Sequence, residues 1–181
     1  MKPLPQSFFA RDTVVVAQDL IGKIIEIKGI KSRIVETEAY CRDEASHAHK
    51  KTERSQIMFD TYSYVYVYLI YGMYHCLNFT ANKKDAGAVL IRAVEPLDHF
   101  EKLKLNRNTD KITSLCSGPG KLCQALGIDK KYNGLKLGEE IKIFDDGFTA
   151  KIGSSSRIGI VKAKELPWRF FAEGSEFVSK S

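Results

Sequence analysis

The chain has 181 residues, of which 44% are hydrophobic and 28% are charged, with a formal net charge of +6 at pH 7. This ordinary globular composition argues against intrinsic disorder, and the length suits one domain over residues 1–181 rather than two. The positive charge favours a polyanionic partner, either nucleic acid or an anionic membrane surface.

Neither a membrane segment nor a targeting segment is indicated. No stretch approaches the roughly 18 consecutive apolar residues of a membrane span. The first residues, MKPLPQSFFARD, lack the apolar region of a signal peptide. We therefore expect an intracellular protein without a membrane partner, located in the cytoplasm or nucleoid of a bacterium or in the nucleus of a eukaryote.

The cysteines indicate neither a disulfide framework nor a zinc site. They show no C-x-x-C spacing, so we expect them to be reduced and mainly buried. Adding nearby histidines does not produce a typical ligand spacing either, and we expect no metal and no cofactor. The four cysteines are Cys41, Cys76, Cys116 and Cys123.

In chain order, residues 11–22 predict a short helix that begins at the N-cap Asp12. Residues 23–40 predict two strands that turn near Gly29. Residues 41–55 are polar and charged without periodicity, which predicts a surface loop.

The second half of the chain predicts a hairpin over residues 62–80 and then an apolar strand, two helices and two strands around an Asp-Gly turn. Ser117 is expected to cap the second helix. Together these elements predict an α+β fold: a single compact domain with a mostly antiparallel curved sheet, a protruding β-hairpin and a few peripheral helices. The segments after the hairpin are residues 86–96, 96–105, 117–127, 140–148 and 155–161.

Six of the eight tyrosines lie between Tyr62 and Tyr74. Strand alternation places Tyr62, Tyr64, Tyr66 and Tyr68 on one face. A type II′ turn at Gly72-Met73 would leave Tyr71 and Met73 at the tip, where no core requires them. Aromatic β-propensity explains part of this crowding. A projecting apolar wedge that unstacks a duplex, with a slot for the displaced base behind it, is the other interpretation.

The strand before the loop carries a candidate general base. Glu36, Glu38 and Tyr40 share one face by the same alternation, which puts a carboxylate beside a stacking ring. The alternative is that both glutamates are exposed strand carboxylates. Arg92 lies in an apolar strand and needs a carboxylate partner, either Glu38 or Glu36. If Glu38 is that partner, we expect its acidity to increase.

Several motifs in this order resemble those of the alkyladenine (3-methyladenine) DNA glycosylases. The resemblance extends from about residue 9 to residue 178 and is specific, because long motifs agree in order and approximate spacing. The motifs are VETEAY (35–40), DEASH (43–47), YVYLIYGMYHCLN (66–78), AVLIRAVEP (88–96), SGPGKLCQALGI (117–128), PWRFF (167–171) and GSEFVS (174–179).

The resemblance implies a catalytic role for two residues. Glu38 matches the glutamate that activates the attacking water, and Arg92 matches the arginine that helps to position the water and the site. Breaking an N-glycosidic bond builds positive charge on the sugar, which a carboxylate can stabilise. The absence of a lysine in a recognisable nucleophile motif predicts attack by water and no strand cleavage.

The resemblance also implies how the base is held. Tyr40, His47 and Tyr68 match residues that enclose the flipped base. Asn78 matches the asparagine at the pocket floor that helps to exclude the exocyclic amine of guanine. The sequence departs modestly from the family, at Leu77, at Gly120 and in the 41–55 loop, and the loop difference bears most on how tightly His47 closes the pocket and so on substrate range.

Other matches concern the DNA. Tyr71 matches the tyrosine that inserts into the minor groove, with Met73 beside it at the tip. Lys121, in the SGPGK segment that opens a helix, could contact a phosphate, or this segment could be an ordinary helix cap.

The predicted function is that of a monomeric, monofunctional glycosylase. It would release alkylated or deaminated purines from double-stranded DNA and so initiate base excision repair; 3-methyladenine is the expected lesion, with hypoxanthine and ethenoadenine as further candidates. The alternatives are a module that flips or stacks bases without hydrolysis and, third, an enzyme acting on a small molecule in the aromatic pocket.

Overall fold

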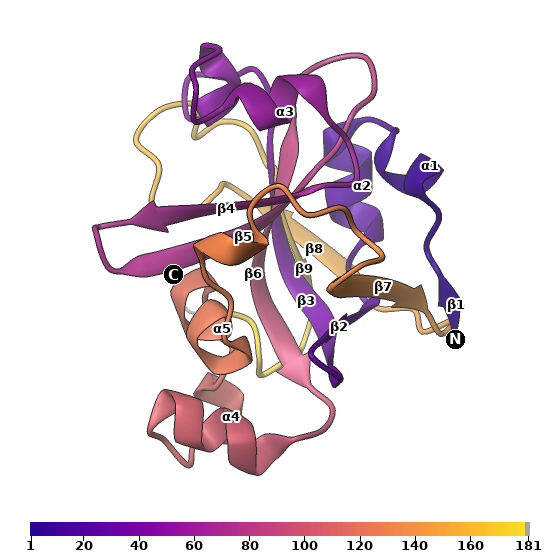
Figure 1. Cartoon of the computed structure of the whole chain (residues 1–181), viewed down its shortest axis with the longest axis vertical. Helices are drawn as coiled ribbons and strands as arrows, with labels where there is room; N and C mark the ends of the chain where they lie inside the picture. The colour runs from indigo at the N-terminus through magenta and orange to yellow at the C-terminus, as the bar shows by residue number, and fades with distance from the viewer. Residues whose placement is uncertain (180–181) are drawn as a thin grey trace.

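The computed structural model describes residues 1–179, and its centre is a strongly curved antiparallel sheet with helices around it (Figure 1). The predicted α+β class, the curved sheet and the protruding hairpin are confirmed. The strands are β1 (Lys2–Pro3), β2 (Ile24–Ile27), β3 (Ile30–Tyr40), β4 (Val65–Ile70), β5 (Tyr74–Thr80), β6 (Ala88–Pro96), β7 (Ile141–Asp145), β8 (Ile152–Ser155) and β9 (Arg169–Ala172).

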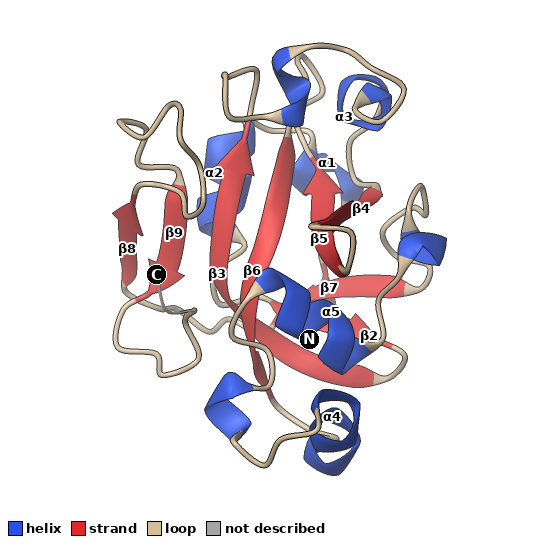
Figure 2. Cartoon of the chain, turned by 90° about the vertical axis from the view of Figure 1, so that its left-hand side faces the viewer, coloured by secondary structure: helices blue, strands red, loops and turns tan. Residues whose placement is uncertain are grey.

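The helices are short and surround the sheet, and some of them pack against its central strands (Figure 2). The α-helices are α1 (Gln6–Phe9), α2 (Thr13–Asp19), α3 (Gln56–Asp60), α4 (Phe100–Arg107) and α5 (Pro119–Leu126). Three single-turn 3-10 helices are η1 (His47–His49), η2 (Ile112–Ser114) and η3 (Lys130–Tyr132). Among residues 1–179, none of these helices has the length and apolarity needed to cross a bilayer.

The long strand β3 organises the sheet. The order of strands is β1-β7-β2-β3-β6-β5-β4, and β9 pairs with β3 and β8. The ladder between β3 and β6 shifts register around Glu36, where β9 joins on the other side. Such a bulge bends a strand and re-aims its side chains, and here it lies directly before Glu38.

The first predicted helix and the first predicted hairpin are confirmed. Asp12 caps α2, because its Oδ1 accepts hydrogen bonds from the amides of Val14 and Val15 at 2.9 and 3.2 Å. β2 and β3 pair across a tight turn at Lys28 and Gly29, both of which have positive φ. Glycine adopts this conformation without steric cost.

The second hairpin is formed by β4 and β5, and its turn differs from the predicted one. Tyr71 and Gly72 both have positive φ, at 52° and 70°, and the Met73 amide donates to the Ile70 carbonyl at 3.2 Å. Two positive φ values define a type I′ turn rather than type II′. The predicted turn type is therefore wrong, but Tyr71 and Met73 do lie at the tip.

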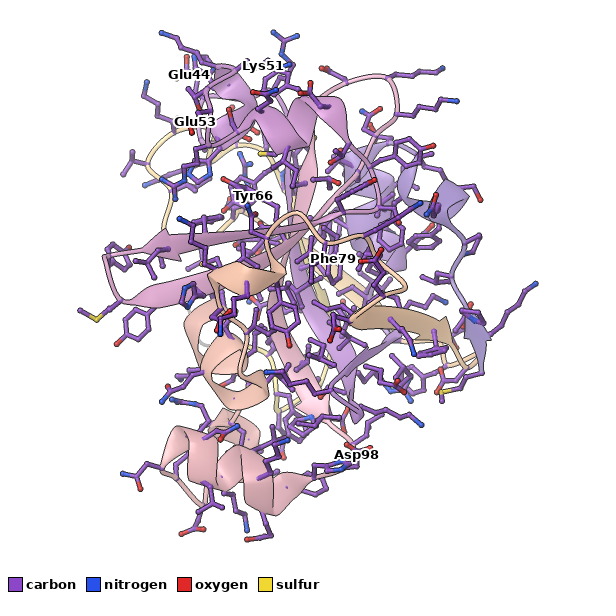
Figure 3. The ribbon with its side chains drawn as sticks, viewed as in Figure 1. Glu44, Lys51, Glu53, Tyr66, Phe79 and Asp98 are labelled. Carbon is purple, nitrogen blue, oxygen red and sulfur yellow. The ribbon has the colours of Figure 1, made fainter. Side chains whose placement is uncertain are left out.

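The hairpin packs against apolar residues on both of its faces. Val65, Leu77 and Phe79 belong to the main core. Tyr66 lies in a second, smaller cluster with Met58. Figure 3 shows the labelled Tyr66 on the side of the hairpin nearer α3, and Phe79 further towards the centre of the molecule.

The helix α5 is confirmed, but its predicted cap is not. Its N-cap is Gly118, without a side-chain hydrogen bond, and Pro119 occupies the first helical position. Ser117 instead forms a β-bridge with Ala93. The helix ends at Gly127, which has a positive φ of 65°. Its apolar residues, Leu122, Cys123, Ala125 and Leu126, are buried in the core.

The last two predicted strands do not form a hairpin. β7 pairs with β1 and β2, whereas the next strand, β8, pairs with β9. The predicted strand over 155–161 is wrong beyond Ser155, because the Arg157 side chain is buried in an ion pair with Asp43 and the chain then turns at Gly159, whose φ is 75°. The result is a loop over residues 156–161 that reaches the site described below.

Candidate functional site

A cavity of about 790 Å³ opens between the β4–β5 hairpin, the start of α5 and the 158–160 loop. Its volume lies within the range of small-molecule sites. The sequence-predicted residues that line it are Tyr40, His47, Tyr68, Tyr71, Asn78, Arg92 and Lys121. These come from segments far apart in the chain, and the structure brings them together around one space.

Glu38 lies directly behind the wall of this cavity and has no exposed surface. Its Oε2 accepts a hydrogen bond from the Tyr40 hydroxyl at 2.8 Å, and its Oε1 accepts one from the Ile158 amide at 2.7 Å. Tyr40 and Ile158 both line the cavity. The carboxylate therefore borders the cavity through its hydrogen-bond partners, and the interpretation of Glu38 as an exposed strand carboxylate is excluded.

Arg92 lies between two buried carboxylates. Its Nε donates to Oε1 of Glu36 at 3.0 Å, and its Nη1 lies 3.4 Å from Oε1 of Glu38. Both predicted partners are thus present. Arg92 is 7% exposed and borders the cavity, whereas Glu36 is completely buried.

The acidity of Glu38 differs from the expectation. Burial raises its pKa above the ordinary value of 4.5, and this effect outweighs the lowering by Arg92 and by the hydrogen bonds from Ile158 and Tyr40. The expected increase in acidity is therefore wrong, because removal from water disfavours the charged form more than the arginine favours it.

Aromatic rings form one wall of the cavity. The ring centroids of His47 and Tyr68 are 4.7 Å apart at an interplanar angle of 70°, and those of Tyr66 and Tyr68 are 5.4 Å apart. His47 Nδ1 lies 2.8 Å from the Tyr66 hydroxyl. Burial lowers the pKa of His47 and raises the pKa of Tyr68. The imidazole and the phenols that face the space are therefore uncharged near neutral pH, and the charged side chains that line it include Arg54 and Arg92.

Asn78 is buried at the back of the cavity. Its Nδ2 donates to the backbone carbonyls of Tyr66 and Cys76 at 3.1 and 3.2 Å. These two acceptors fix the orientation of the amide, because only the NH₂ group can donate to a carbonyl. The Oδ1 acceptor therefore points away from these carbonyls.

The tip of the hairpin projects into solvent at the mouth of the cavity. Tyr71 is 79% exposed and Met73 is 66% exposed, although large apolar side chains usually find a core. Gly120 of α5 packs against Tyr74 beside the tip, where an added Cβ would meet the Tyr74 Cβ at 3.1 Å. Lys121 follows on the exposed side of α5 and also borders the cavity.

The 41–55 loop lies on the surface, as predicted, and Figure 3 shows the labelled Glu44, Lys51 and Glu53 together at one end of the molecule. Both histidines of η1 are exposed, but only His47 lines the cavity. All four cysteines are free. No cluster of three or more metal-binding side chains occurs in residues 1–179.

Several residues of the site were not predicted. Arg157 is buried, pairs with Asp43 at 2.7 Å, and lies 4.7 Å from the centre of the Tyr40 ring. Arg54 lies 4.9 Å from the centre of the Tyr68 ring. The only signal for Arg157 in the sequence was an arginine before the apolar segment Ile-Gly-Ile. Those apolar neighbours favoured the prediction of a strand rather than of a site residue. Nothing in the polar 41–55 segment distinguished Arg54.

Known proteins are similar in sequence to this chain over nearly its whole length. A family model described as "Methylpurine-DNA glycosylase (MPG)" matches residues 7–176. A protein of Clostridium novyi (strain NT) is 45% identical over 99% of this chain and 100% of its own length. Relatives from Rhizobium johnstonii and Clostridium perfringens (strain 13) are 46% and 44% identical, over 97% and 98% of this chain and 88% and 98% of their own lengths. All three carry the name "Putative 3-methyladenine DNA glycosylase". The chain therefore belongs to the methylpurine-DNA glycosylase family.

Proposed function

We propose that this protein is a monofunctional DNA glycosylase that flips alkylated or deaminated purines out of duplex DNA and hydrolyses their N-glycosidic bond. One observation carries the proposal: a buried carboxylate, Glu38, is hydrogen-bonded to the wall of an aromatic cavity behind an exposed Tyr-Gly-Met turn. Family membership supports the same reaction class. The substrate is double-stranded DNA containing a damaged purine, and a single chain supplies every part of the site.

The cavity suits a cationic purine such as 3-methyladenine. A positively charged ring is attracted to the face of a tyrosine by about 0.5–2 kcal/mol, depending on how far the pair is desolvated. Because the pKa of His47 is lowered, this ring adds no competing positive charge near neutral pH. Tyr40 and Tyr68 supply aromatic surface for such a base, and the guanidinium groups of Arg157 and Arg54 lie against the same two rings at 4.7 and 4.9 Å from their centres.

The tip of the hairpin supplies the means of entry. An apolar wedge inserted from the minor groove unstacks a base step and bends the duplex. Tyr71 and Met73 are exposed in the position that such a wedge requires, with the cavity directly behind them. Flipping costs a few kcal/mol and least for a damaged base, so the wedge favours lesions before any chemistry occurs.

Glu38 serves as the general base and stabilises positive charge on the sugar. The bond between C1′ and the base nitrogen breaks, and its electron pair leaves with the base. The oxygen of a water molecule forms the new bond to C1′, and its proton passes to Glu38. A cationic base such as 3-methyladenine leaves uncharged and needs no proton, whereas a neutral lesion such as hypoxanthine takes up a proton as it departs. A carboxylate with a raised pKa is the stronger base, and each of its oxygens has two lone pairs. The Tyr40 and Ile158 bonds therefore leave capacity for the water.

Arg92 favours the ionised form of Glu38 and borders the space where the water would lie. Because, among residues 1–179, the only lysine that lines this cavity is the exposed Lys121, we propose direct attack by water without a Schiff base. The products are then a free base and an intact strand with an abasic site.

In the deciding experiment, the purified protein is incubated, in the presence of EDTA, with duplexes that carry 3-methyladenine, hypoxanthine or 1,N6-ethenoadenine. Release of free base without strand cleavage is expected, and it identifies the range of lesions. Glu38→Gln should abolish release while lesion binding is retained. Glu53→Gln, the same change on the exposed 41–55 loop, should leave release unchanged. Tight lesion binding by the wild-type protein without release would identify a non-catalytic base-flipping module instead.

A further inference from the structure

Glu36 is a second buried carboxylate whose position the reaction itself does not explain. It does not border the cavity, and its exposed surface is zero. Burying a carboxylate is costly unless charged partners and hydrogen bonds compensate it. Glu36 has four such partners: Oε1 accepts from Arg92 Nε, Arg169 Nε and Ser179 Oγ, and Oε2 accepts from the Ser179 amide.

The distances in this cluster are short. Arg169 Nε lies 2.7 Å from Glu36 Oε1, and the Ser179 amide lies 2.8 Å from Oε2. Ser179 Oγ donates to Glu36 at 2.9 Å and accepts from Arg92 Nη2 at 3.3 Å. Glu36 is therefore held from three directions, by β6, by β9 and by the segment that follows β9.

These contacts also fix Arg92. Its guanidinium is planar, and its five N–H donors have a rigid geometry. Glu36 holds Nε and Ser179 holds Nη2, so the direction of the remaining nitrogen, Nη1, is determined. Nη1 is the nitrogen that lies 3.4 Å from Glu38. Glu36 thus acts on Glu38 through Arg92.

The charges of the cluster are balanced. Two carboxylates, Glu36 and Glu38, face two guanidinium groups, Arg92 and Arg169. The other groups near Glu38 are Tyr40 and, from β4 and β5, Tyr68 and Cys76. In the 156–161 loop, Arg157 is paired with Asp43. The balance therefore depends on Glu36, because its removal leaves Arg92 and Arg169 with one carboxylate between them.

We propose that Glu36 is a positioning residue that, together with Arg169 and Ser179, holds Arg92 at a fixed distance from Glu38 and so sets how strongly Arg92 acts on this carboxylate. This inference rests on the proposed function of Glu38. Without Glu36, Arg92 is free to form a closer pair with Glu38. The carboxylate then becomes more acidic and a weaker base, although its own contacts with Tyr40 and Ile158 are unchanged.

The test is the pH dependence of single-turnover excision by the wild-type protein and by Glu36→Gln. The variant keeps the size of the side chain and removes its charge. We expect the acidic limb of the rate profile to move to lower pH, because a negative charge near Glu38 is lost and Arg92 approaches it. We also expect the plateau rate to fall by about 10²-fold, the cost of a misplacement near 1 Å at a reacting group.

A second pair of variants tests the hydroxyl of Ser179 without changing charge. Ser179→Ala removes its contacts with Glu36 and Arg92, so we expect a smaller loss of rate with unchanged lesion affinity. Ser179→Thr retains the hydroxyl and should restore the rate. Ser154→Ala, on an exposed position of β8, is the matched control and should behave as the wild type.

The outcomes separate the two proposals. If the wild-type protein releases no base, the proposed function itself is wrong. If the wild type releases base and Glu36→Gln lowers the rate without moving the acidic limb, Glu36 is only structural and the positioning role is overturned. Thermal unfolding of each variant identifies losses caused by misfolding. Should Glu36→Gln not fold, the Ser179 pair decides: equal rates for the alanine and threonine variants would overturn the proposal.

Discussion

The hydroxyl of Tyr40 donates a hydrogen bond to Oε2 of Glu38 across 2.8 Å. A ring that borders the cavity is thereby coupled to the buried carboxylate behind it. In the proposed function, the same residue stacks on a base with its face and holds the proposed general base with its hydroxyl. Base binding and proton transfer would then meet at this one side chain.

Tyr40→Phe separates these two roles. The ring remains for stacking, whereas the bond that lowers the pKa of Glu38 is lost, so this pKa should rise further above its ordinary value. We expect the acidic limb of single-turnover excision to move to higher pH, with little change in lesion affinity. Tyr66→Phe is the control within the site, because the Tyr66 hydroxyl contacts His47 rather than Glu38. An unmoved limb in Tyr40→Phe would contradict the coupling.

The raised pKa of Glu38 also predicts how stability depends on pH. The folded state binds the Glu38 proton more tightly than the unfolded state, so stability associated with this group falls as pH rises from 4.5 through the folded pKa. Urea unfolding at pH 5 and pH 8 should therefore show that the free energy of unfolding of the wild type, minus that of Glu38→Gln, decreases with pH. A difference that increases would mean that the pKa is lowered instead.

Tyr71→Ser removes the aromatic part of the wedge. We expect excision of hypoxanthine from a stable base pair to slow by about 10-fold or more, because a few kcal/mol of unstacking is no longer offset. Val15→Ser, at an exposed position on α2, is the matched control for loss of an exposed apolar side chain. Fluorescence of 2-aminopurine next to the lesion measures flipping directly, and an unchanged signal and rate would argue against a wedge.

Lys121→Ala tests whether the start of α5 contacts a DNA phosphate. Loss of one phosphate contact reduces the slope of log K against log salt concentration by about 0.9 and weakens binding to damaged and undamaged duplexes alike. Lys142→Ala makes the same charge change on an exposed position of β7. Equal salt slopes for the two variants would mean that Lys121 is only a solvated side chain.

Gly87→Ala tests the packing between the residue that precedes β6 and the start of α2. An added Cβ would lie 2.0 Å from Thr13 Oγ1 and 3.0 Å from Thr13 Cβ, so α2 would have to move. We expect a loss of about 1–3 kcal/mol in the free energy of unfolding, the usual cost of overpacking. Thermal or urea unfolding measures it. The same change in a Thr13→Ala background should cost less, and equal costs would show that the contact is relieved elsewhere.

Much of the fold is readable from local patterns. The N-cap Asp12, the turn at Gly29 and the apolar run of β6 each specify one element through nearby residues alone. The type of the turn at Tyr71 and Gly72 was predicted wrongly. A tyrosine rarely adopts a positive φ, so the sequence favoured a turn in which glycine comes first. The prediction that Ser117 caps α5 was wrong, because Ser117 pairs with Ala93 of β6. That strand is distant in sequence, so no local pattern indicates the pairing.

The site was readable where its residues lie within one strand or hairpin. Glu38 and Tyr40 are two residues apart on β3, and alternation alone brings them together. The contacts of Glu36 with Arg169 and Ser179 join positions 133 and 143 residues apart, which no local pattern indicates. The direction of the pKa shift of Glu38 depends on burial relative to charge, and burial follows only from the complete fold.

The β4–β5 hairpin is packed against the rest of the molecule at its base, and its tip is exposed to solvent. Val65 and Phe79 anchor one face in the main core, and Tyr66 anchors the other in the smaller cluster. Packing on both faces restrains bending of the hairpin in either direction. In the proposed function, a force at Tyr71 would therefore displace the nucleic acid rather than the tip, and the stiffness for this would come from the core of the molecule.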